Sequence, residues 1–86
     1  MIRKYRNKEE IYASILRSTL SDGGGTRITK LMYDSLLSYM QLRVHLKELV
    51  DYGLIVNEPD ITRYRLTEKG LRFLKLMESM DGLLKN

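Results

Sequence analysis

Residues 38–53 read SYMQLRVHLKELVDYG and carry signals for both ends of a helix. Ser38 can cap the first turn, and Gln41, three residues later, completes the pattern of a capping box. Gly53 can adopt the left-handed conformation that commonly ends a helix. We therefore expect a helix over about 39–52.

The two faces of this predicted helix differ in their chemistry. At 3.6 residues per turn, the apolar face consists of Tyr39, Leu42, Leu46, Leu49 and Val50. The outer face consists of Met40, Gln41, Val44, Lys47, Glu48 and Asp51, with Arg43 and His45 on its flanks. The acids of the outer face lie at its C-terminal end, and the rest is apolar, neutral or basic. A helix that enters the DNA major groove by its N-terminal half has this pattern.

Length and composition bound the class of protein. A chain of 86 residues is expected to form one small domain. Cores of this size are marginal, and oligomerisation is a common remedy. Cysteine is absent, which predicts no disulfide framework and no thiolate metal site and fits a reducing cytoplasm. We expect no membrane segment, because no apolar run reaches the roughly 20 residues that a spanning helix needs.

The charge favours a polyanionic partner. The formal net charge is +4, and its distribution along the chain is uneven. Four basic residues fall in residues 1–8, and four more fall in residues 26–47 against one acid. Residues 48–62 contain only acidic charges. Positive charge is therefore concentrated in an N-terminal arm and around the helix over 39–52 and the segment before it.

A first helix is predicted over 8–20, ahead of a glycine run. Asn7 is a good N-cap, and Glu10 at the third position after it completes a second capping box. Residues 21–25 read SDGGG and should end the helix. A phosphate-binding loop would need a preceding strand and a terminal Gly-Lys-Ser/Thr, and this chain has neither. A helix terminator is the better interpretation of the glycines.

A second, short helix is predicted over about 27–33, with Thr26 as its cap. Its inward face would be Ile28, Leu31 and Met32. Residues 34–37 would connect it to the next helix, which makes a helix-turn-helix. Any small helical bundle contains such a pair, so the pair alone does not establish the motif.

The segment that follows predicts a β-hairpin. Residues 54–58 are apolar and β-branched, 59–62 suit a turn, and 63–66 alternate with period two. A helix-turn-helix followed at once by a hairpin is the winged-helix arrangement. Arg63 and Arg65 would share one face of the return strand. They could contact DNA or protect an edge strand from aggregation, and the two roles are compatible.

A long C-terminal helix is predicted over 68–84. Thr67 would cap it, and Gly70 in its first turn is tolerated. The a and d spacing of a coiled coil is followed by Phe73, Leu76, Met80 and Leu83. A second apolar flank, suited to packing on the domain, consists of Leu71, Leu74 and Met77. We therefore expect a DNA-binding domain over 1–66 and a dimerisation element over 67–86 within one structural domain. A single broad core face is the alternative.

Three motifs resemble a known family. They are LSYMQL at residues 37–42, GLI at 53–55 and YRLTEKG at 64–70. At these separations they resemble the short archaeal and archaeal-virus winged helix-turn-helix DNA-binding proteins. The resemblance implies an α+β, mostly helical fold and a DNA-binding transcriptional regulator that is homodimeric through its C-terminal helix. It implies location at the nucleoid in the cytoplasm, or in the host cytoplasm if the protein is viral.

The expected site is therefore a surface for double-stranded DNA. Base edges would be contacted by Met40, Gln41, Val44 and Lys47, with Gln41 able to bond adenine through both amide atoms. The DNA backbone would be contacted by Arg27, Lys30, Ser38, Tyr39 and Arg43, and flanking phosphates or the minor groove by Arg63 and Arg65. The predicted hairpin carries acids at Glu58 and Asp60, where a basic tip would suit phosphate better. For that reason the contact between the hairpin and DNA is assigned to the flanking residues Arg63 and Arg65, not to the tip.

No enzyme activity is expected. The one histidine, His45, is interpreted as a surface residue, and no His, Cys or carboxylate cluster predicts a metal or other cofactor. No small-molecule ligand is evident. Two alternatives to a specific regulator stay open: an architectural protein with little sequence preference, and a winged-helix module for protein–protein assembly.

Overall fold

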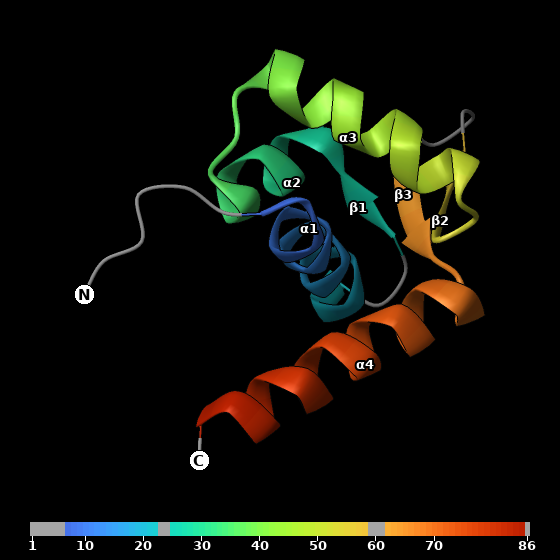
Figure 1. The fold of residues 1–86 in the computed structure, drawn as a ribbon. Helices are drawn as coiled ribbons and strands as arrows, with labels where there is room; N and C mark the ends of the chain where they lie inside the picture. The colour runs from blue at the N-terminus through green and yellow to red at the C-terminus, as the bar shows by residue number, and fades with distance from the viewer. Residues whose placement is uncertain (1–6, 23–24, 59–61, 86) are drawn as a thin grey trace.

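The computed structural model describes residues 7–22, 25–58 and 62–85. Its elements are α1 (Lys8–Asp22), β1 (Thr26–Arg27), α2 (Ile28–Ser35), α3 (Tyr39–Asp51), β2 (Ile55–Glu58), β3 (Arg63–Leu66) and α4 (Glu68–Lys85) (Figure 1). The predicted α+β, mostly helical fold is confirmed, with a helix-turn-helix, a hairpin and a long last helix. The basic arm in residues 1–6, the glycines at 23–24 and the turn at 59–61 lie outside the described residues.

Local sequence explains where α1 and α4 begin. The side chain of Asn7 accepts from the N–H of Glu10 at 2.8 Å, and the carboxylate of Glu10 accepts from the N–H of Asn7 at 3.1 Å. In α4, Thr67 Oγ1 accepts from the N–H of Gly70 at 2.9 Å. Each bond satisfies a first-turn N–H that has no partner inside the helix. The predicted caps at both helices are confirmed.

The start of α2 differs from the sequence prediction. The cap is Arg27, whose side chain makes no capping bond, and α2 spans 28–35 instead of 27–33. Thr26 lies buried in β1, where its hydroxyl donates to the carbonyl oxygen of Ser18 at 3.3 Å. Thr26 is therefore held by strand pairing and by α1, which removes it from the cap.

The three strands form one antiparallel sheet in the order β1-β3-β2. Tyr64 in the central strand β3 pairs with Thr26 on one side and with Asn57 on the other. The hairpin of β2 and β3 was predicted, whereas β1 was not. Through β1, the sheet joins the segment before α2 to the hairpin.

Helix α3 confirms its predicted ends and corrects its predicted apolar face. Ser38 and Gln41 form the capping box, and Gly53 has a φ of +78°. Two residues assigned to the inward face are partly open to solvent: Tyr39 is 51% exposed and Val50 38% exposed. Both lie at the edge of the apolar arc that faces the hairpin, where they line hollows in the surface.

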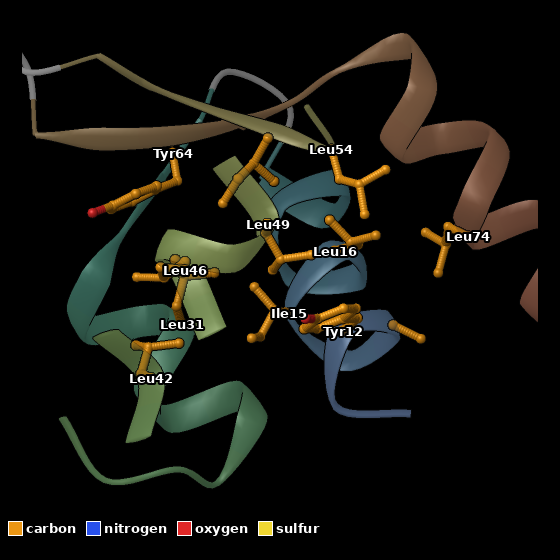
Figure 2. Close-up of a cluster of buried hydrophobic side chains, with 12 residues drawn as sticks. Tyr12, Ile15, Leu16, Leu31, Leu42, Leu46, Leu49, Leu54, Tyr64 and Leu74 are labelled. Atoms are coloured by element: carbon orange, nitrogen blue, oxygen red, sulfur yellow. The ribbon is translucent and has the colours of Figure 1, made fainter. Parts of the chain in front are cut away.

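The core is shared by helices from both ends of the chain (Figure 2). Its buried hydrophobic residues are Tyr12, Ala13, Ile15, Leu16, Leu31, Leu42, Leu46, Leu49, Leu54, Ile55, Tyr64 and Leu74. Helix α1 runs through the middle of the fold, and α3 and α4 lie on different sides of it in Figure 1. This arrangement leaves the outer face of α3 and one face of α4 uncovered.

The first turn of α4 packs tightly against Leu54, in the turn between α3 and β2. A Cβ placed on Gly70 would overlap the carbonyl oxygen of Leu54 and lie 2.8 Å from Leu66 Cδ1. Glycine at this position is therefore needed, which corrects the sequence reading that it is merely tolerated. Two residues of the predicted packing flank are confirmed, since Leu74 is buried and Met77 packs on the core, whereas the third, Leu71, is half-buried and is not part of the core cluster.

Candidate nucleic-acid interface

The outermost residues of α3 form a line along its axis, which we call the outer ridge: Met40, Val44, Lys47 and Asp51. Their spacing of four, three and four residues keeps them on one face, opposite the buried leucines. Met40 is 78% exposed and Val44 is 58% exposed. Lys47 Nζ lies 3.2 Å from Asp51 Oδ2. The ridge is thus apolar in its N-terminal half and carries an ion pair in its C-terminal half.

Gln41 lies beside the ridge, and its side chain is already engaged. Its Oε1 accepts from the N–H of Ser38 at 3.0 Å, while its own N–H donates to Ser38 Oγ at 3.2 Å. Bonding adenine through both amide atoms needs the carbonyl oxygen and the amide nitrogen to face the base together, and the capping bond turns the carbonyl oxygen toward Ser38. Adenine recognition of this kind would therefore break the capping box, whereas the amide nitrogen alone can still donate to a base.

A groove separates α3 from the β2–β3 hairpin. Two hollows of about 320 and 300 Å³ lie there, and both are lined by Arg43, Asn57 and Tyr64. The guanidinium carbon of Arg43 lies 5.8 Å from the centre of the Tyr39 ring, within cation–π range. Asn57 was not singled out from the sequence. A polar residue in a short predicted strand gives no sequence signal for DNA contact, and Asn57 is a candidate because it lines this groove.

The two hairpin arginines are bonded within the chain. Arg63 is half-buried, and its Nη1 donates to the carbonyl oxygen of Gly25 at 2.9 Å. Arg65 Nη2 lies 2.9 Å from Glu58. An exposed ion pair such as the second contributes little stability, so a phosphate can compete with Glu58 for Arg65. Arg63 is the more constrained of the two.

The basic residues of the β1–α2 segment are exposed. Arg27 caps α2 and makes no capping bond, while Lys30 Nζ lies 2.6 Å from Asp34 Oδ2. The pKa of Asp34 is held below its usual value mainly by the hydrogen bond from Lys30 and to a smaller extent by the bond from Ser18. Asp34 raises the pKa of Lys30 in return. Lys30 is therefore a firmly charged cation at the surface, held beside one carboxylate.

Glu48 and His45 are placed differently from the sequence prediction. Both are half-buried, and Glu48 Oε1 accepts from the Tyr12 hydroxyl at 2.7 Å and lies 3.1 Å from His45 Nδ1. The pKa of Glu48 is lowered mainly by the hydrogen bond from Tyr12 and to a smaller extent by the bond to His45. The pKa of Tyr12 is raised mainly by burial and to a smaller extent by its bond to Glu48. Glu48 therefore links α3 to α1 through Tyr12. The i, i+3 pair His45–Glu48 was the available sequence signal.

The predicted dimerisation residues differ in their exposure to solvent. Leu76, Met80 and Leu83 are 67%, 55% and 83% exposed. Phe73 is half-buried and packs toward Tyr12, with ring centres 6.4 Å apart. Three of the four residues are thus open for contact along one side of α4, while Phe73 also belongs to the fold of its own chain.

Neither a metal site nor a membrane span is found where the structure can be described. Within residues 7–22, 25–58 and 62–85, no group of three or more His, Cys, Asp or Glu side chains could hold a metal ion. None of the helices in the same ranges has the length and apolar character to cross a bilayer. The distinctive surfaces described above are the outer ridge with its groove and the exposed side of α4.

Comparisons with known proteins agree with this geometry. A search of the curated proteins found no match. Among solved structures, the fold resembles Sso10a-2, a DNA-binding protein from Sulfolobus solfataricus, with a TM-score of 0.76 and 29% sequence identity. The similarity covers 94% of this chain and 84% of that chain. A family model described as winged helix-turn-helix matches residues 5–85. The chain therefore belongs to the winged helix-turn-helix family.

Proposed function

We propose that this protein binds double-stranded DNA by placing α3 in the major groove, and that it does so as a homodimeric transcriptional regulator. The observation that carries the proposal is the outer ridge of α3 beside a groove lined by Arg43. An α-helix with side chains is about 10–12 Å across, close to the roughly 12 Å width of the major groove. The solved DNA-binding relative of similar fold supports the same assignment.

The residues of the expected DNA surface divide into two roles under this proposal. Base edges would meet the outer ridge at Met40, Val44 and Lys47, together with the amide nitrogen of Gln41. Phosphates would meet Arg27, Lys30, Ser38, Tyr39, Arg43, Arg63 and Arg65. Phosphate contacts position a protein on the duplex, whereas base contacts specify the sequence. Since both Lys30 and Arg65 are paired with carboxylates, phosphate binding would exchange one anion for another at these positions.

Salt dependence tests the proposal. Arg43→Ala should weaken binding to every duplex and reduce the slope of log affinity against log salt by roughly 0.9, because one phosphate contact is lost. Lys75→Ala is the matched control, since Lys75 is an exposed cation on α4. Fluorescence anisotropy titrations at several salt concentrations measure both slopes. Affinity without salt dependence, or equal slopes for the two variants, would oppose α3 as the DNA-binding helix and favour a protein-assembly role.

A second candidate function is an architectural DNA-binding protein with little sequence preference. The capped Gln41 favours it, because few hydrogen-bonding groups remain at the N-terminal half of the ridge. A genome-wide footprint separates the two functions. Discrete, pseudo-palindromic sites support a regulator, whereas a uniform coat of protein supports an architectural role.

The proposed dimer uses the open side of α4, over residues 67–86. Leu76, Met80 and Leu83 would pack on their copies in a second chain, with Phe73 at the inner end. Covering these side chains removes exposed apolar surface from water, which stabilises the dimer. A two-fold dimer would present two α3 helices to half-sites about one helical turn, or a multiple, apart.

A further inference from the structure

We propose that Met40 and Val44 recognise the 5-methyl group of pyrimidines in the major groove, above all that of thymine. The inference rests on the proposed function and adds the chemistry that α3 reads. The motivating observation is an exposed apolar pair in the N-terminal half of α3, where Met40 is 78% and Val44 58% exposed. The thymine methyl is the apolar group that a base pair presents in the major groove.

Apart from the amide nitrogen of Gln41, the neighbouring side-chain hydrogen-bonding groups on α3 have contacts within the protein. The carbonyl oxygen of Gln41 accepts from the backbone of Ser38 at 3.0 Å. Lys47 is 3.2 Å from Asp51, one turn further along the ridge. Arg43 is directed to the groove side, where it lies against the Tyr39 ring. Contact between the N-terminal half of the ridge and base edges would therefore be made chiefly by Met40 and Val44.

The spacing of the pair suits a duplex. Four residues of helix rise about 6 Å, close to two base-pair steps of roughly 3.4 Å each. Met40 and Val44 can thus reach methyl groups on base pairs two steps apart when α3 lies along the groove. The cation Arg43 lies on the groove side of the pair and complements phosphate there. Two apolar side chains also offer far less area than a stable protein–protein interface requires.

The expected effect follows from the size of one methyl group. Removing a methyl-sized apolar group from water changes affinity by roughly fourfold, so one or two contacts per chain predict about fourfold to fifteenfold. The effect should be independent of salt, because no ion is released when an apolar contact forms. Salt dependence therefore separates methyl contacts from the phosphate contacts of Arg43.

Duplexes that differ only in pyrimidine methyl groups test the inference. One pair contains A·T base pairs and the same sequence with uracil in place of thymine. The other pair contains G·C base pairs and the same sequence with 5-methylcytosine in place of cytosine. Each is about two helical turns long. We expect the parent protein to prefer the methylated member of both pairs by about fourfold or more in anisotropy titrations.

Variants assign the preference to the ridge. Met40→Ala/Val44→Ala should weaken binding to the methylated duplexes and bring the ratio in each pair close to one. Val56→Ala is the matched control, since Val56 is an exposed valine on β2, and it should keep the parent ratio. Circular dichroism checks that the variants stay folded, which is expected because the substituted side chains lie at the surface.

The outcomes separate the inference from the proposed function. No binding to any of the duplexes would overturn both. Equal binding to methylated and unmethylated members would overturn methyl recognition and leave DNA binding standing. A preference that persists in Met40→Ala/Val44→Ala would place the methyl contact elsewhere on the protein and overturn the assignment to the ridge.

Discussion

The two halves of α4 contain similar apolar side chains and meet different surroundings. In the first half, Gly70 lies against the Leu54 carbonyl and Leu74 is 1% exposed. In the second half, Met80 is 55% and Leu83 83% exposed, and a Cβ on Gly82 would meet nothing within 4 Å. Apolar spacing thus identifies faces that favour burial, but it does not say whether the same chain or a second copy covers them.

Gly70→Ala should produce the largest loss of stability. Its Cβ would overlap the Leu54 carbonyl oxygen, so α4 must move away from the turn between α3 and β2, and the bond from Thr67 N–H to Leu54 O at 3.2 Å must stretch. We expect the free energy of unfolding to fall by about 3 kcal/mol or more, at the upper end for overpacking. Chemical denaturation followed by circular dichroism measures it.

Gly82→Ala is the control within the same helix. Nothing crowds this position, and alanine is the better helix former, so stability should rise by about 0.5–1 kcal/mol. A loss of similar size in both variants would mean that the two ends of α4 are equally packed, and the contrast between them would disappear.

Leu74→Ala and Leu76→Ala should differ in their loss of stability by less than the two glycine variants do. Leu74 lies at the α4 side of the core in Figure 2, and its truncation should cost about 2–3 kcal/mol, since α4 can shift to fill part of the space. Leu76 is 67% exposed, so its truncation should change the stability of the dilute monomer by under about 0.5 kcal/mol. Thermal unfolding at low concentration compares the pair, and equal losses would contradict the separation of the two faces.

Local signals made the ends of three helices predictable. The pairs Asn7–Glu10 and Ser38–Gln41, and the cap at Thr67, depend on residues within one turn, so spacing in the sequence is sufficient to find them. The hairpin was predicted for a similar reason, because period-two alternation is local. Together these elements gave the order of helices and strands that distinguishes the fold.

Contacts between residues that are far apart in the chain could not be predicted from local sequence patterns. Strand β1 has two residues and no period of its own, and it exists because Thr26 pairs with Tyr64. The need for glycine at position 70 comes from a carbonyl sixteen residues earlier, at Leu54. At the candidate site, residue type and helical spacing placed Met40 and Val44 on the surface correctly. The bond from Tyr12 to Glu48 and the bond from Arg63 to Gly25 join residues far apart in the sequence, which periodicity does not encode.

Met80→Glu tests whether the open side of α4 is an interface between two chains. In the proposed dimer the substitution brings like charges together in an apolar seam, which should weaken dimerisation at least about tenfold, or roughly 1.4 kcal/mol. In the monomer Met80 is 55% exposed, so the folded chain should tolerate the carboxylate. Sedimentation at several protein concentrations should give a dimer for the parent and a monomer for the variant.

Gly82→Glu supplies the matched control for the seam, because it adds the same carboxylate about 125° around the helix from the centre of the strip of Leu76, Met80 and Leu83. A Cβ there meets nothing within 4 Å, so the control should sediment as the parent does. A parent that stays monomeric, or a Met80→Glu protein that dimerises as tightly as the parent, would remove the seam from α4. If both variants sediment as monomers, the interface extends around the helix and is not limited to the strip. If Met80→Glu alone dissociates, its preference for paired half-sites should also fall while its affinity for a single half-site is kept, since α3 and its groove lie on the other side of α1.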